Sequence, residues 1–111
     1  MTRAVTIGVL LLAAVFEAGG DALVRTGIHA DSKWQRALLF VAGAVVLFAY
    51  GWTVNAPPWD FGKVIGIYVV FFFIIAQLIS WLVFKQPPSL MVMLGGLMIV
   101  GGGVVIAFAS A

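Results

Sequence analysis

Three charged side chains lie at helical spacing within an apolar stretch near the N-terminus. Glu17, Asp21 and Arg25 stand at positions i, i+4 and i+8, and the run Val5–Val24 around the two acids otherwise reads as membrane-spanning. Residues at this spacing share one face of an α-helix. An ionisable side chain at bilayer depth costs at least ~2.5 kcal/mol on insertion scales, so such residues usually face a partner or a water-filled cavity. The stripe therefore predicts a polar site inside a membrane-spanning helix.

The chemistry that suits this stripe is competition between a proton and a cation for one carboxyl. Low dielectric disfavours the charged form of a carboxyl, and two carboxyls one helical turn apart titrate as a coupled unit. Such a group can release its proton when a cation arrives, which couples proton flow to cation flow without a covalent step. We expect Glu17 to be the proton and cation site and Asp21 to be its coupled partner. In the alternative interpretation, Asp21 pairs with Arg25 one turn further on, and Glu17 acts alone.

The composition of the chain identifies the elements that must hold this site. The chain has 111 residues, of which 64% are hydrophobic and 9% are charged, a balance typical of integral membrane proteins. A spanning helix needs about 20 largely apolar residues, so the apolar runs fit four helices with short loops. We expect an all-α integral membrane protein in which residues 1–111 form a single four-helix transmembrane domain. The helices are predicted near residues 3–25, 35–55, 62–84 and 89–110. The first run is too long for a signal-peptide core and is expected to be retained.

Prolines and polar residues mark the turns between these helices. The proline pairs at 57–58 and 87–88 interrupt the helical pattern, because proline lacks the backbone donor that the helix ladder needs. A polar loop is expected over residues 27–36, and Ser89 is expected to cap the fourth helix. The polar and aromatic residues near the end of the second helix are interpreted as interfacial anchors. They are Tyr50, Trp52, Thr53 and Asn55.

Pairs of glycines indicate where helices can pack closely. One pair has the small-xxx-small spacing in the third helix, and two pairs in the fourth helix recur at a seven-residue interval, which predicts a smooth surface for another helix. These helix-packing glycines are Gly62, Gly66, Gly95, Gly96, Gly102 and Gly103.

The spacing of Glu17, Gly20 and Arg25 resembles the first helix of the small multidrug resistance transporters. That family has a membrane-embedded Glu, a Gly three residues on and a Lys eight residues on. The segment 79–87 is similar to the end of the family's third helix, and Gly95 with Gly102 matches its dimerisation stripe. The resemblance extends over nearly the whole chain in length and helix count.

The resemblance implies a divergent member of this family, which is part of the drug/metabolite transporter superfamily. Family members are antiparallel dimers of four-helix subunits, whose paired Glu residues bind either protons or a cationic substrate during alternating access. Proton-coupled antiport of small organic cations is therefore the expected function. Tyr68 stands in for the family's Trp and is expected to form an aromatic wall that offers a cation–π contact. The expected supporting residues are Gly20, Arg25, Gln77 and Ser80.

Two other functions remain open at this point. One is a non-transporting subunit of the same fold that assembles with a partner protein in a hetero-oligomer, and the other is a lipid or lipid-linked-sugar flippase component. An enzyme is not expected, because the sequence has no nucleophile with a base, no metal-ligand cluster and no cofactor fingerprint. We expect no cofactor, no metal and no nucleic-acid partner. The expected partners are membrane lipid, protons, small organic cations and a second copy of the chain, and the expected location is the bacterial inner membrane.

Overall fold

Four long helices make up most of the chain. The computed structural model describes residues 1–109, and within them it contains α1 (Arg3–Ile28), α2 (Lys33–Val54), α3 (Phe61–Leu82) and α4 (Leu90–Ala107). All four are long and apolar enough to cross a membrane. The expectation of an all-α membrane protein with four transmembrane helices is therefore confirmed. The predicted end of the fourth helix, at residue 110, lies outside the described residues.

The first loop is shorter than the sequence suggested. Helix α1 continues to Ile28 and α2 begins at Lys33, so the prediction of a loop over residues 27–36 was wrong at both ends. Arg36 explains the difference, because its Nε donates to the carbonyl of Gly27 at 3.2 Å and its Nη2 to the carbonyl of Ala30 at 2.9 Å. Carbonyls at a helix end have no partner within the helix. A side chain from the next helix satisfies them here and lets α1 run on past Arg25.

Serine hydroxyls start two of the helices. The Oγ of Ser32 accepts a hydrogen bond from the backbone N–H of Gln35 at 3.1 Å, and the Oγ of Ser89 accepts one from Val92 at 3.2 Å. Each hydroxyl satisfies a donor that the first helical turn leaves free. The predicted cap at Ser89 is confirmed. Helix α3 ends at Leu82, two residues before the predicted end, and Lys85 then turns the chain with a φ of 59°.

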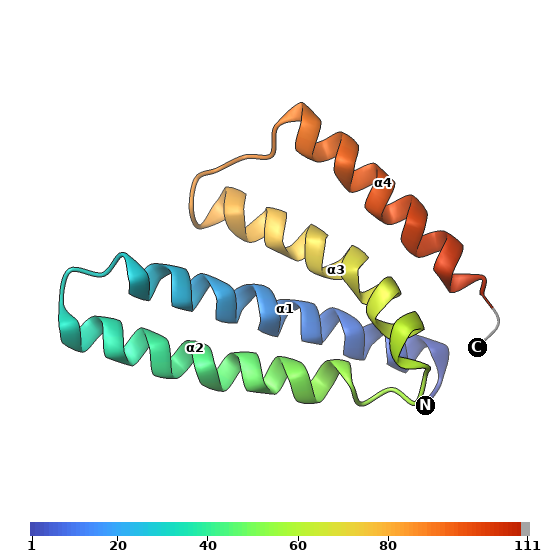
Figure 1. The fold of residues 1–111 in the computed structure, drawn as a ribbon, viewed down its shortest axis with the longest axis horizontal. Coiled ribbons are helices and arrows are strands. Elements are labelled where there is room, and N and C mark those ends of the chain that lie inside the picture. The colour runs from blue at the N-terminus through green and yellow to red at the C-terminus, as the bar shows by residue number, and fades with distance from the viewer. Residues whose placement is uncertain (110–111) are drawn as a thin grey trace.

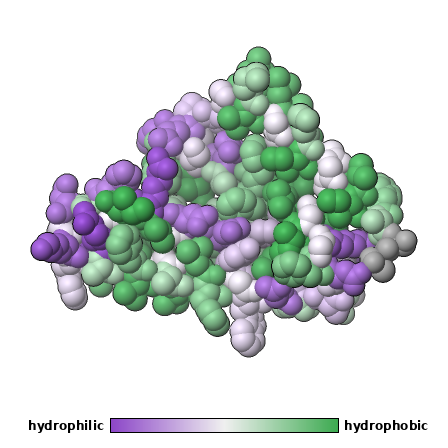
Figure 2. Space-filling view, viewed as in Figure 1, coloured by the Kyte–Doolittle hydropathy of each residue, from purple (hydrophilic) through white to green (hydrophobic). Residues whose placement is uncertain are grey.

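The helices form two hairpins that meet along α1 and α3 (Figure 1). Helix α1 packs against both α2 and α3, whereas α4 contacts only α3 within residues 1–109. The α1–α2 and α3–α4 loops lie at one end of the molecule, and the N-terminus, the α2–α3 turn and the end of α4 lie at the other (Figure 1). Figure 2 shows hydrophobic surface over much of the helices, with hydrophilic surface towards both ends and in a band that reaches the middle of this face.

Glycines set the closest approach of the helices. A Cβ added at Gly20 would lie 2.7 Å from Leu47 Cγ, and one at Gly43 would lie 2.8 Å from Val24 Cγ2, so α1 and α2 pack through these positions. On α4, Gly96 lies against Phe73 of α3 and Gly103 against Val70 of α3. The other glycine pair on α4, Gly95 and Gly102, is open, because an added Cβ would meet nothing within 4 Å in the described chain. On α3, Gly62 is open in the same way, whereas Gly66 lies against Ile106 of α4.

A buried cluster joins the first three helices near the N-terminal half of α1. It consists of Leu10, Ala13, Ala14, Val54, Val64 and Tyr68. The α1 positions in it lie on the Arg3 side of Glu17. This packing therefore seals one end of the bundle and brings α3 against the helix that carries the acidic stripe.

Candidate functional site

Glu17 of α1 and Tyr68 of α3 meet inside the bundle. The hydroxyl of Tyr68 lies 2.7 Å from Oε1 of Glu17 and donates a hydrogen bond to it. Tyr68 is only 3% exposed, because it is part of the buried cluster, whereas Glu17 is partly exposed. Hydrogen bonds to a charged group contribute about 1.5–3 kcal/mol. The structure thus places together two residues that the sequence singled out from segments 51 residues apart.

The hydroxyl of Tyr68 has a second acceptor within reach. The backbone carbonyl of Ala13 lies 3.4 Å from it. A phenol carries one hydrogen and can also accept, so it can donate to only one of these two oxygens at a time. It can donate to Glu17 when that carboxyl is ionised. When the carboxyl is protonated, the hydroxyl can accept from Glu17 and donate to Ala13 instead, so Tyr68 has a partner for either state of the acid.

Two further aromatic rings extend the wall that Tyr68 forms. The ring of Tyr50, on α2, lies 5.6 Å from the ring of Tyr68, and the ring of Phe72, one turn further along α3, lies 6.2 Å from it. Aromatic faces attract cations, more strongly where water is excluded. Helices α2 and α3 thus supply three neighbouring rings, of which Tyr68 contacts Glu17, and we call Tyr50, Tyr68 and Phe72 the aromatic wall.

Tyr50 was interpreted from the sequence as an interfacial anchor, and the structure instead places it against Tyr68. The signal that could have identified it is its spacing from Gly43. Residues 43, 47, 50 and 54 share one face of α2, and Gly43, Leu47 and Val54 on that face contact α1 or are buried. A tyrosine on the packed face of a helix points into the bundle. The neighbouring polar residues behave differently, because Thr53 and Asn55 donate to carbonyls of their own helix.

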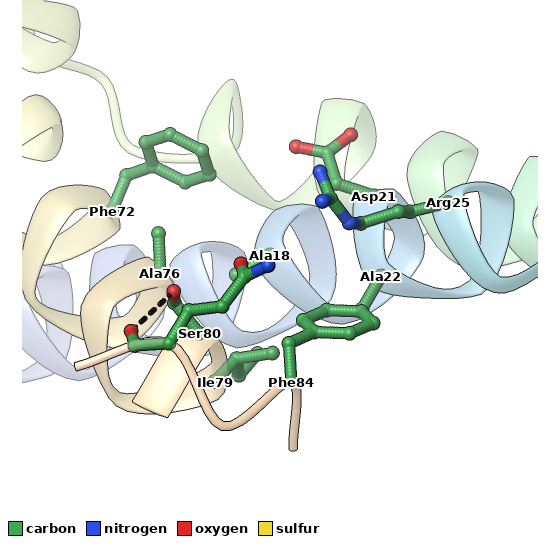
Figure 3. A pocket seen from close by; sticks show the side chains of 10 residues that line it. Ala18, Asp21, Ala22, Arg25, Phe72, Ala76, Ile79, Ser80 and Phe84 are labelled. Atoms are coloured by element: carbon green, nitrogen blue, oxygen red, sulfur yellow. Dashed lines mark hydrogen bonds between the residues drawn. The ribbon is translucent and has the colours of Figure 1, made fainter. Parts of the chain in front are cut away.

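A cavity of about 260 Å³ opens between α1 and α3 near Arg25 (Figure 3), and Glu17, one helical turn from Asp21, lies outside its lining. Helix α1 contributes Asp21 and Arg25 to its lining, and α3 contributes Phe72 and Ser80. Phe72 also stacks on Tyr68, so the cavity and the aromatic wall share a side chain. Phe72 therefore links the cavity to the Glu17–Tyr68 pair, while the buried cluster lies on the Arg3 side of Glu17.

Asp21 and Arg25 both line this cavity without forming an ion pair. No salt bridge within 4.0 Å joins them among residues 1–109, and the Arg25 guanidinium instead lies 5.3 Å from the centre of the Phe84 ring. Asp21 is exposed. The interpretation in which Asp21 is held by Arg25 therefore finds no contact in this structure, and Asp21 lines the cavity (Figure 3).

The remaining predicted site residues lie in three different places. Ser80 lines the cavity, but its hydroxyl donates to the carbonyl of Gln86 at 2.9 Å. Gln77 lies in a separate apolar groove between α3 and α4, with Trp81 and Met93. Gly20 lies against Leu47, where it lets α2 approach the helix that carries Glu17. Among the described residues, no group of three or more His, Cys, Asp or Glu side chains is placed to hold a metal ion.

Comparison of the sequence with known proteins places the chain in a family. Residues 3–111 match the family described as "Uncharacterised BCR, YnfA/UPF0060 family". A UPF0060 membrane protein of Herpetosiphon aurantiacus is 30% identical over 109 residues, which cover 96% of this chain and 94% of that protein. A UPF0060 membrane protein of Clostridium beijerinckii is 32% identical over 101 residues, which cover 89% and 88%. No solved structure matches the chain. With four helices able to cross a membrane and relatives that are bacterial membrane proteins, the chain is an integral membrane protein that belongs to the YnfA/UPF0060 family.

Proposed function

We propose that this protein exchanges protons for small organic cations across the membrane, with Glu17 as the shared binding site. The observation that carries the proposal is the 2.7 Å contact between Glu17 of α1 and Tyr68 of α3, two helices long and apolar enough to span a membrane, with a cavity lined by Asp21 one turn further along α1. A carboxyl in such a place is costly unless it has a function or a partner. The partner here is neutral, so the site stays free to accept a proton or a cation.

The binding step follows from the groups around Glu17. A cation that enters the cavity meets Asp21, which lines it, and then moves one helical turn along α1 to Glu17, which lies outside the lining; Phe72 belongs to both the cavity and the aromatic wall. The proton leaves Glu17 as the cation arrives, because both cannot occupy the carboxylate together. Tyr68 changes from accepting a hydrogen bond to donating one, and the rings attract the cation by cation–π contact. No covalent step is needed.

The two ends of the bundle differ in packing, since one holds an open cavity and the other a buried cluster, and this difference supports alternating access. The cavity opens towards the end of α1 that carries Arg25, and the buried cluster packs the end that carries Arg3. Transport requires a second state in which that cluster opens and the cavity closes. The Glu17, Gly20 and Arg25 spacing supports kinship with the small multidrug resistance family. The open face of α4 with Gly95 and Gly102 supports an antiparallel homodimer, in which the two copies would exchange these states.

The test is cation-driven proton flux in proteoliposomes that contain the purified full chain. Guanidinium and quaternary ammonium compounds are added under a fixed pH gradient, and internal pH is followed with an entrapped dye. Substrate-dependent flux should be lost in Glu17→Gln and reduced in Asp21→Asn. Asp31→Asn is the matched control, because Asp31 is an exposed acid in the α1–α2 loop and its loss should leave the flux unchanged.

Two results would contradict the proposal. Flux that survives in Glu17→Gln would show that the carboxyl is not the shared site. If folded wild-type protein gave no flux with any compound, the non-transporting assembly subunit would become the better interpretation. The search would then turn to proteins that co-purify with the wild-type chain and are lost with Glu17→Gln.

A further inference from the structure

A second polar cavity lies at the opposite end of the bundle, where the N-terminus, the α2–α3 turn and the end of α4 come together (Figure 1). It has a volume of about 260 Å³. Two cations, three aromatic side chains and three aliphatic side chains line it; they are Arg3 and Lys63, Trp59, Phe71 and Phe108, and Ile7, Ile67 and Ala107. We call this cavity the headgroup pocket. It draws residues from α1, α3 and α4, and it shares no residue with the cavity beside Glu17.

The headgroup pocket is positively charged. Arg3 and Lys63 both line it, and none of the described residues that line it is acidic. Lys63 is held in place, because its Nζ donates to the carbonyl of Ala109 at 3.0 Å and lies 5.5 Å from the centre of the Trp59 ring. An ammonium group has three donors, so two remain for a ligand. Arg3 makes no hydrogen bond through its guanidinium to any residue in 1–109, and it is exposed. Two cations on one small pocket repel each other unless an anion lies between them.

An apolar groove continues from the headgroup pocket towards the membrane interior. It runs between α3 and α4 and shares Ile67, Phe71 and Ala107 with the pocket. Beyond them it is lined by Val70, Val100, Gly103 and Val104, without a polar side chain. We call it the acyl groove. A charged rim at the ends of the helices with an apolar channel below it has the layout of a phospholipid, whose headgroup sits at the membrane interface and whose chains point inwards.

We propose that the headgroup pocket and the acyl groove together bind one anionic phospholipid. Its phosphate would lie between Arg3 and Lys63, Trp59 would sit at headgroup level, and one acyl chain would follow the acyl groove. Basic pockets between transmembrane helices recognise anionic headgroups in this way. A soluble phosphate would satisfy the two cations and leave the groove empty, so the groove favours the lipid over the free anion.

The bound lipid would connect α4 to α1. Helix α4 contacts only α3 in the described chain, and Lys63 of α3 donates to the carbonyl of Ala109, two residues beyond the end of α4. A phosphate that contacts Arg3 of α1 and Lys63 of α3, with its chain against α4, would span three helices at once. Anionic lipid should therefore raise the thermal stability of the protein more than a zwitterionic lipid with the same acyl chains does, because a ligand that binds only the folded state stabilises it.

The experiment is native mass spectrometry of the full-length protein in detergent, with palmitoyl-oleoyl phosphatidylglycerol and the matching phosphatidylcholine offered in equal amounts. The wild type should retain phosphatidylglycerol preferentially. Retention should fall by about fivefold in Arg3→Gln and again in Lys63→Gln, which is the loss expected for one cation near an anionic headgroup. Lys33→Gln removes an exposed cation from the other end of the bundle and should leave retention unchanged. Lys63→Arg keeps the charge and should retain the lipid, which separates lipid loss from misfolding.

One more variant and one competitor distinguish binding of a lipid from binding of a free phosphate. Val104→Trp would fill the acyl groove at an exposed position, so it should lower phosphatidylglycerol retention without altering the charges. Glycerol 1-phosphate, which has the headgroup chemistry and no acyl chain, should neither compete with the lipid nor raise the thermal stability. Equal retention of both lipids, the same loss in Lys33→Gln, or full competition by glycerol 1-phosphate would each overturn the proposal.

Discussion

At Glu17 the chemistry depends on one hydroxyl hydrogen with two acceptors. Tyr68 lies 2.7 Å from the carboxylate and 3.4 Å from the carbonyl of Ala13. The shorter contact is to the stronger acceptor, as expected when the acid is ionised. The carbonyl gives the hydroxyl another acceptor when the acid is neutral. A proton can then be taken up without leaving a buried polar group unpaired, which would cost about 1–3 kcal/mol.

Replacing Tyr68 with Phe tests this contact. Tyr68→Phe keeps the ring of the aromatic wall and removes the hydroxyl, so the ionised form of Glu17 loses a hydrogen bond of about 1.5–3 kcal/mol. We expect substrate-driven proton flux to fall by about tenfold or more, since 1.4 kcal/mol corresponds to a factor of ten. The measurement is the proteoliposome assay with each variant at equal protein content.

Tyr50→Phe is the matched control for this residue. Tyr50 contacts Tyr68 through its ring, and its hydroxyl makes no hydrogen bond to the part of the chain that the structure describes. This variant should keep most of the wild-type flux, whereas Tyr50→Leu, which removes the ring, should not. A similar loss in Tyr50→Phe and Tyr68→Phe would show that the hydroxyl of Tyr68 has no special place in transport.

At the scale of the helices, one glycine brings α2 onto the helix of the acidic stripe. A Cβ at Gly20 would lie 2.7 Å from Leu47 Cγ and 3.3 Å from the backbone N of Leu47, whereas a Cβ at Gly19 would meet nothing within 4 Å in the described chain. The Leu47 backbone cannot move out of the way as the end of a flexible side chain can. Close packing through small residues is a major source of helix association in membranes.

The adjacent glycines give a paired stability prediction. Gly20→Ala should lower the free energy of unfolding by about 1–3 kcal/mol, the usual cost of overpacking. Gly19→Ala should leave it unchanged or raise it, because alanine favours helix and the site is open. Both values can be measured by SDS titration followed by circular dichroism. Equal destabilisation by the two substitutions would show that the contact at Gly20 does not hold α1 and α2 together.

Sequence reasoning succeeded for elements whose signal is local. Four apolar runs and a serine cap at Ser89 are read from neighbouring residues, and both are present. It failed where a partner from another helix decides the outcome. Arg36 extends α1 by donating to the carbonyl of Gly27, and the residues next to Gly27 in the sequence do not indicate this hydrogen bond. Tyr50 looked like an anchor because its neighbours in the sequence are interfacial, and its place on the same helix face as Gly43, which puts it against Tyr68 of α3, was given less weight.

For the whole molecule, α4 is the element with an unfilled surface. It packs on α3 through Gly96 and Gly103, and its other glycine pair, Gly95 and Gly102, faces open space in the described chain. The sequence assigned both pairs to helix packing without separating them. In the structure the two pairs lie on different faces, so one pair packs within the single chain and the other is open in the described chain.

The two faces of α4 make opposite predictions for adjacent residues. Gly102→Leu should weaken association of the chain with itself by about tenfold, equivalent to ~1.4 kcal/mol, and leave the unfolding of the single chain unchanged. Gly103→Leu should destabilise the single chain, because Val70 occupies the space that its side chain needs. The chain contains no cysteine, so one introduced by Asp31→Cys in the first loop gives a unique labelling site. Energy transfer between donor- and acceptor-labelled copies in liposomes then measures association. Unchanged transfer in Gly102→Leu would show that the open face of α4 is lipid-facing and that the dimer, if one forms, uses another surface.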